Sequence, residues 1–250
     1  MKKFMIFFIL TFLSVSLSAQ EHLTFKNIPI EGSVSAYVAK LEAVGFYLLH
    51  ENDGRSAILQ GSFAGFDDCT VYVIGSKSSK TVWKVVVGLP HQLSWSSTRS
   101  RYEDFKESYT AKYGKPADSF EFFIDPYEKG DGYELQAIKL EKGYYTTFWE
   151  LSAGTIFVGI SASNNSDGWV RLVYEDAAGV EIMNREKNQI IEEEVFFAGV
   201  VGPNVFDTLI DFTFVFHFLE VLDDFERSSR AHGIIDKLVF GGRPRCIFEF

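Results

Sequence analysis

The apolar runs of this chain are separated by connections of only a few residues. Turn-forming residues, such as Asn52-Asp53-Gly54 and the stretch Gly75–Lys80, stand between runs rich in β-branched and aromatic residues. A parallel crossover between strands needs about a dozen residues or more, whereas an antiparallel hairpin needs only a short turn. The sequence therefore predicts strands joined as antiparallel hairpins.

The predicted elements fall into two similar halves. A helix begins after Ser33, whose hydroxyl can cap it, and ends at Gly45; a second helix spans Trp95–Tyr113 and ends at Gly114. The predicted strands are Phe46–His50, Ile58–Phe63, Thr70–Ile74 and Val82–Leu89, and then Ser119–Ile124, Glu134–Leu140, Tyr144–Leu151, Thr155–Ser161 and Trp169–Glu175. We expect an α+β fold in which an antiparallel sheet, or sheets, carries two helices on one face. Residues 21–92 and 93–187 then form two pseudo-repeats, or two β-rich halves that are alike by chance.

The N-terminus has the layout of a secretory signal peptide. Lys2 and Lys3 precede the apolar run Phe4–Leu13, and small residues follow as far as Ala19. A membrane span needs about 20 apolar residues, and this run is roughly half that length. We expect residues 1–20 to be removed, which leaves a secreted or periplasmic protein without stable membrane insertion.

Residues 188–250 differ in composition from the 21–187 core. They hold 11 of the 25 Phe residues, and the stretch Ile210–Phe218 has Ile or Phe at every second position, with Asp211, Thr213, Val215 and His217 between them. Period two predicts a strand, and an unpaired strand of this kind favours aggregation. Two interpretations stay open for this Phe-rich tail: an additional packing element or small domain, and an out-of-frame continuation of the core.

The net charge limits the classes of partner that the protein can bind, and the two cysteines raise the question of a disulfide after export. The net charge of −10 argues against binding to the phosphate backbone of a nucleic acid. Cys69 and Cys246 could pair after export, but a core of this size does not need a disulfide to be stable. We therefore favour a buried Cys69 thiol over a Cys69–Cys246 disulfide.

The sequence contains no motif for catalysis, for a cofactor or for a metal. It has neither a phosphate-binding glycine loop nor a Gly-x-Ser-x-Gly hydrolase elbow, and its five His residues are not at ligand spacing from one another. We expect no catalytic, cofactor-binding or metal-binding residues and no cofactor.

Aromatic residues supply the candidates for a ligand or partner surface. Tyr127 and Tyr133 lie in an acidic segment that suits a sugar platform, although an ordinary hairpin connection has the same composition. The pairs Tyr144-Tyr145 and Phe148-Trp149 place large rings on both faces of one predicted strand. If the helices cover one face of the sheet, the rings on the other face are either exposed to solvent or covered by another part of the chain. The predicted surface residues are Tyr127, Tyr133, Tyr145 and Trp149.

The chain from Leu23 to Asp176 resembles a set of uncharacterised exported bacterial proteins. The segments that carry this resemblance are Leu23-Thr24-Phe25 with Ile28-Pro29-Ile30 and Gly32, then Gly45-Phe46, Leu59-x-Gly61-x-Phe63-Ala64-Gly65 and Lys112-Tyr113-Gly114-x-Pro116. The layout is also similar to that of the β-lactamase inhibitory proteins, which place helices against a sheet in two tandem copies. This chain departs from them in having one helix per half and one core cysteine, so no binding residue is carried over.

Three functions follow as expectations. The first is a non-enzymatic module that binds another exported protein through an exposed sheet face or its loops. The second is recognition of a glycan by the tyrosine-rich loops, and the third is a hydrolase whose site is scattered along the chain.

Overall fold

The computed structural model describes residues 21–164 and 166–201. Contacts divide the chain into two units, residues 1–190 and 191–250. The predicted signal peptide (1–20), the segment Ile210–Phe218 and Cys246 lie outside the described residues. Helix α4 (Ala177–Val201) runs through residue 187, where the sequence predicts the end of the core. No helix within the described ranges is both long and apolar enough to cross a bilayer.

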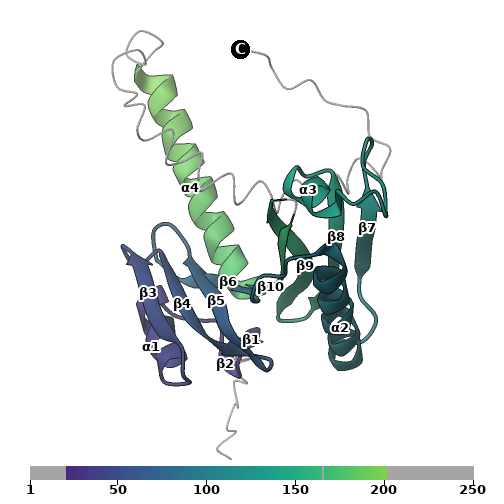
Figure 1. Cartoon of the computed structure of the whole chain (residues 1–250). Coiled ribbons are helices and arrows are strands. Elements are labelled where there is room, and N and C mark those ends of the chain that lie inside the picture. Colours follow the sequence, from purple (N-terminus) through teal and green to yellow (C-terminus); the bar gives the residue numbers. More distant parts are fainter. Residues whose placement is uncertain (1–20, 165, 202–250) are drawn as a thin grey trace, which may run out of the picture. The chain divides into compact units, whose positions relative to one another are not determined.

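The described chain is an α+β protein, as the sequence predicts, and Figure 1 shows its elements. The first half holds β1 (Thr24–Phe25), β2 (Ile28–Pro29), α1 (Val34–Glu42), β3 (Tyr47–Asn52), β4 (Ser56–Phe63), β5 (Phe66–Gly75) and β6 (Val82–Gly88). The second half holds α2 (Trp95–Tyr113), β7 (Asp118–Phe123), α3 (Glu134–Lys139), β8 (Gly143–Leu151), β9 (Gly154–Asn164) and β10 (Asp167–Asp176).

Eight of the strands form one antiparallel sheet in the order β3-β4-β5-β6-β10-β9-β8-β7. Strands β3 to β6 form one four-stranded meander and β7 to β10 form another. The two meanders join through their last strands, where Val85 of β6 lies opposite Tyr174 of β10. Each half therefore contributes four strands to the sheet, and the second half contains α3 in addition to α2.

One face of this sheet forms the protein core. Residues that lie opposite one another in antiparallel strands point to the same face, so the register defines a row of side chains across the sheet. The row from β4 to β8 is completely buried and consists of Leu59, Val71, Val87, Leu172, Val158 and Thr147.

Helices α1, α2 and α3 all pack on this buried face. The Tyr102 side chain of α2 is hydrogen-bonded to Thr147, a member of the buried row. Gly75 lies two residues after core residue Val73, and a Cβ at Gly75 would lie 2.6 Å from the Val34 side chain of α1. A Cβ at Gly168 of β10 would similarly lie 2.5 Å from the Leu135 side chain of α3. The sequence predicts two helices on one face of the sheet, and the structure has α3 as a third helix on that face.

Local chemistry explains where the two longer predicted helices begin and end. Ser33 accepts a hydrogen bond from the backbone N–H of Ala36 and caps α1, as the sequence predicts. Ser94 caps α2 in the same way through the N–H of Ser97. Gly114 ends α2 with a φ of 86°, a conformation that side-chain-bearing residues rarely adopt.

The predicted strand Glu134–Leu140 is wrong, because residues Glu134–Lys139 form helix α3. Leu135 and Ala137 are both buried, so the segment has an alternating apolar pattern over a short distance. The segment is also composed of Glu, Leu, Gln, Ala, Ile and Lys, most of which have high helix propensity. Propensity and packing of Leu135 prevail over an alternation that is too short to decide.

Asp176 connects three segments at the end of β10. Its carboxylate is completely buried and accepts hydrogen bonds from the backbone N–H groups of Leu23 (2.8 Å) and Gly179 (2.9 Å). The ring nitrogen Nδ1 of His22 lies 3.0 Å from the same carboxylate. The Gly179 contact satisfies an otherwise unpaired N–H in the first turn of α4. Asp176 thus joins the N-terminal segment, the central strand and α4.

Glu186 attaches α4 to the turn between β5 and β6. Its carboxylate accepts hydrogen bonds from the N–H groups of Ser78 (2.7 Å) and Ser79 (3.0 Å) and from the Ser76 hydroxyl (3.0 Å). Burial by itself raises the pKa of Glu186, but the hydrogen bonds from these serines outweigh it, so the pKa lies below its usual value.

We predict that Glu186→Gln lowers the free energy of unfolding by about 1–3 kcal/mol at neutral pH, because a charged acceptor is lost. A group whose pKa is lowered by folding stabilises the protein above its unfolded-state pKa, which is about 4.3 for Glu. The difference between wild type and variant therefore shrinks as the pH falls through the folded-state pKa of Glu186. Urea unfolding at several pH values measures this difference, with the exposed Glu181→Gln on the same helix as control. An equal effect of the two substitutions would contradict the prediction.

Candidate functional site

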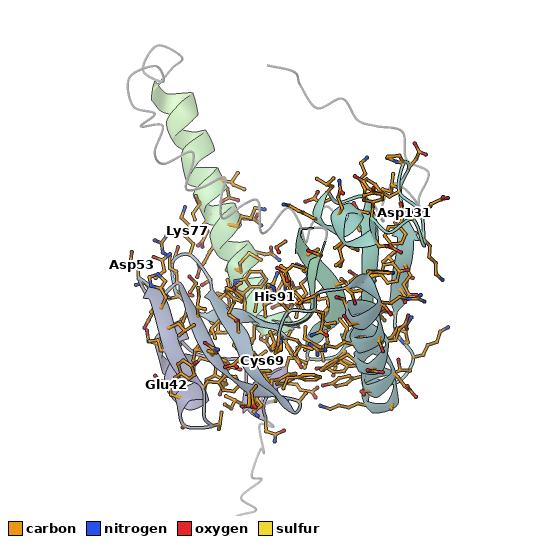
Figure 2. All side chains as sticks on the ribbon, viewed as in Figure 1. Glu42, Asp53, Cys69, Lys77, His91 and Asp131 are labelled. Atoms are coloured by element: carbon orange, nitrogen blue, oxygen red, sulfur yellow. The ribbon has the colours of Figure 1, made fainter. Side chains whose placement is uncertain are left out.

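The predicted tyrosine-rich loop lies between β7 and α3, where Figure 2 labels Asp131. Asp131 accepts hydrogen bonds from the backbone N–H groups of Glu128 (3.0 Å) and Tyr133 (2.7 Å), one on each carboxylate oxygen. Glu134 is buried and accepts a hydrogen bond from the N–H of Gly130. These carboxylates hold the loop in its conformation, and the loop joins a strand to a helix, so it is not the hairpin connection that the sequence analysis offers as one interpretation.

The two tyrosines of this loop differ in exposure. Tyr133 is 55% exposed, whereas Tyr127 is half-buried and its hydroxyl accepts a hydrogen bond from Gln136 Nε2 at 3.3 Å. Tyr133 is therefore the member of the pair that offers most of its ring to a ligand.

Tyr145 and Trp149 lie in the core, and their assignment to a surface is wrong. Their exposed fractions are 4% and 1%, because both point toward the helices from β8. The Tyr145 ring meets Trp95 of α2 edge to face at 4.8 Å, and Trp149 Nε1 donates a hydrogen bond to the carbonyl of Gly114. The expected placement of rings on both faces of this strand is nevertheless found, with Tyr144 and Phe148 on the opposite face.

The opposite face carries a cluster of aromatic rings that we call the open aromatic face. Adjacent rings lie 5.1 Å apart for Phe122 and Tyr144, 6.0 Å for Phe120 and Phe148, and 5.9 Å for Phe148 and Phe157. All five side chains are half-buried. This face is the one away from α1, α2 and α3, since its residues alternate along the strands with those of the buried row. The open aromatic face consists of Phe120, Phe122, Tyr144, Phe148 and Phe157.

Charged groups border the open aromatic face. Asp118 lies opposite Phe148 in the register, and Glu150 follows Phe148 by two residues on the same strand. Both carboxylates are exposed. On the β10 side, the exposed Arg171 lies opposite Gly159, which is two residues after Phe157. The face therefore has an apolar centre, an acidic border on β7 and β8, and a basic group on β10.

A separate groove of about 550 Å³ lies between the β4–β5 hairpin and α2. Its aromatic lining combines Phe63 and Phe66 of the hairpin with Phe105 and Tyr109 of α2. Its polar lining includes Arg101 and Asp104. The sequence analysis missed this groove, because the residues that form it come from segments about thirty to forty positions apart that carry no shared motif.

His91, Asp167 and Ser163 form a polar cluster beside Trp169. His91 Nδ1 lies 2.7 Å from Asp167, and the His91 and Trp169 rings stack at 4.5 Å. The Ser163 hydroxyl also donates to Asp167, and this hydrogen bond, together with that of His91, lowers the pKa of Asp167 against a smaller opposing effect of burial. In a hydrolytic triad the serine donates to the histidine, whereas here both residues contact the same carboxylate. The cluster links Ser163 of β9 with Asp167 of β10 and does not have the geometry of an activated nucleophile.

Cys69 lies in the core, as the sequence analysis favours. Its side chain has no exposed surface, and Figure 2 labels it among the strands. Burial raises the pKa of the thiol, and the hydrogen bond to the carbonyl of Phe63 lowers it by less. Within residues 21–164 and 166–201, no group of three or more His, Cys, Asp or Glu side chains is arranged to hold a metal ion.

Comparisons with protein-family models, with curated proteins and with solved structures find no match for this chain.

We predict that Trp149→Ala lowers the free energy of unfolding by about 3–5 kcal/mol, because it removes a large buried ring. Tyr133→Ala should change this free energy by less than about 0.5 kcal/mol, because its ring is mostly in solvent. Chemical denaturation of the two variants measures both values. A small effect of Trp149→Ala would show that this side chain does not belong to the core.

Proposed function

We propose that this protein is an exported, non-enzymatic binding module that holds another exported protein against its open aromatic face. The observation that supports this proposal is the cluster of five half-buried rings on the sheet face away from α1, α2 and α3. Clusters of exposed aromatic side chains are typical of protein–protein contact sites, in which a few such residues supply most of the binding free energy.

The charges at the border define the chemistry of the partner. Asp118 and Glu150 favour a partner that presents Lys or Arg beside an apolar patch, and the net charge of −10 adds to this preference. Arg171 on the other side places a positive charge at the opposite border, so the two borders of the face differ in charge. Such an arrangement fixes the orientation of the bound partner as well as its affinity.

The sheet is a suitable platform for this contact. Its buried face is fixed by three helices, so the aromatic side chains project from a rigid backbone. A rigid platform loses little conformational entropy on binding. The rings also contact one another across β7, β8 and β9, which further limits their motion.

Site-specific photo-crosslinking tests the proposal in the cell that makes the protein. We replace Phe148 with the photoreactive amino acid p-benzoylphenylalanine, and we place the same residue at the exposed Glu107 of α2 as the control. We expect position 148, and not position 107, to give a cross-link to one other exported protein, which peptide mass spectrometry identifies.

Three outcomes would overturn the proposal. Cross-links from position 148 to residues 188–250 of the same chain would show that the Phe-rich tail occupies this face. Cross-links to a second copy would show that the face serves self-association. Equal yields at positions 148 and 107, or no cross-link at all, would show that the face holds no partner.

A further inference from the structure

The groove between the β4–β5 hairpin and α2 is built from two unlike walls. One wall is the hairpin tip, where Phe63 and Phe66 flank the connection. The other wall is a stripe along α2 made of Ser97, Arg101, Asp104 and Ser108. These positions are spaced by four, three and four residues, so they share one face of the helix.

The polar stripe of α2 is distinct from the stripe that anchors the helix to the core. Thr98, Tyr102, Phe105 and Tyr109 are the buried residues of α2. Most of the α2 side chains that line the groove are not among these buried residues, although Phe105 and Tyr109 line the groove as well. The polar groups of the groove therefore lie on the face of α2 that points away from the core.

Arg101 is held in position before any ligand arrives. Its guanidinium lies 4.4 Å from the centre of the Phe66 ring, and Nη1 donates a hydrogen bond to the carbonyl of Pro90 at 2.8 Å. A guanidinium carries five N–H donors in a fixed plane, so this carbonyl engages only part of its capacity. Ring and carbonyl together orient the guanidinium of a half-buried side chain at the groove.

The hydroxyl groups of the stripe are also oriented. Ser108 Oγ donates to the carbonyl of Asp104, and Ser97 Oγ donates to the carbonyl of Ser94. Ser97 Oγ also lies 2.7 Å from Ser94 Oγ, so one of its lone pairs is already engaged, whereas Ser108 Oγ has no second partner among the described residues and its lone pairs can act as acceptors. The wall thus presents donors on Arg101 and acceptors on Asp104 and Ser108.

The balance of charge in the groove selects the class of ligand. Arg101 and Asp104 contribute one positive and one negative charge, so an anionic ligand would meet Asp104 and a cationic ligand would meet Arg101. A neutral ligand with many hydroxyl groups can donate to Asp104 and accept from Arg101 at the same time. The aromatic lining suits the apolar C–H faces of sugar rings.

We infer that this groove binds a neutral oligosaccharide. Its volume of about 550 Å³ lies within the usual range of ligand sites, about 300–1,000 Å³. The groove is lined by β4, β5 and α2, whereas the open aromatic face lies on β7, β8 and β9. The inference therefore does not depend on the proposed protein partner.

The test uses the full chain after signal removal and an array of neutral oligosaccharides of glucose, galactose, mannose and N-acetylglucosamine. Uncharged peptides are printed on the same array. We expect binding to at least one oligosaccharide series, with affinity then measured by calorimetry using the tetrasaccharide of that series. Asp104→Asn keeps the shape of the side chain and removes its charge, so it should weaken binding about tenfold.

Glu107→Gln is the matched control, since Glu107 is an exposed carboxylate on the same helix that does not line the groove. It should leave the affinity unchanged, and circular dichroism verifies that both variants fold. Binding of peptides in place of sugars, or of no probe, would overturn the inference. Sugar binding that Asp104→Asn and Glu107→Gln leave equally strong would overturn the assignment to this groove.

Discussion

The antiparallel pairing of β6 with β10 is the contact on which the whole sheet depends. It joins two four-stranded meanders, and it places Val85 and Val87 opposite Tyr174 and Leu172 in the centre of the buried face. On the other face the same pairing brings Lys84 to within 3.2 Å of Glu175. Without this pairing each half would have a four-stranded sheet with two free edges and a much smaller core.

The joined sheet allows helices from both halves to share one core. The hydroxyl of Tyr174 on β10 is hydrogen-bonded to that of Tyr109 on α2, and its ring lies 5.4 Å from that of Phe25 near the N-terminus. Burial raises the pKa of the Tyr174 hydroxyl well above its usual value, with a further contribution from nearby Tyr109. A tyrosine that stays neutral in this position acts as an apolar ring with one satisfied hydrogen bond.

The sequence predicts the connectivity of this fold better than it predicts which side chains reach the surface. Short turns identify the hairpins because turn chemistry is local. On β8, however, large rings occur at both Tyr144 and Tyr145 and at both Phe148 and Trp149, so alternation by itself leaves the buried face undetermined. Helix α2 decides which of the two sets of rings is buried, because its Trp95 and Tyr109 contact Tyr145 and Trp149. This is a tertiary contact that no local pattern contains.

The groove between the β4–β5 hairpin and α2 illustrates the same limit. Its aromatic wall forms because the β4–β5 turn uses Ala64 and Gly65, both with positive φ, and so places Phe63 opposite Phe66 at the end of the hairpin. The turn is recognisable from sequence, but its position beside α2 follows from the β6–β10 junction that brings the second half against the first. The pairing that closes the core therefore also brings an aromatic wall from one half beside a polar wall from the other. A groove assembled in this way changes when the junction changes, even though no residue of the β6–β10 pairing lines it.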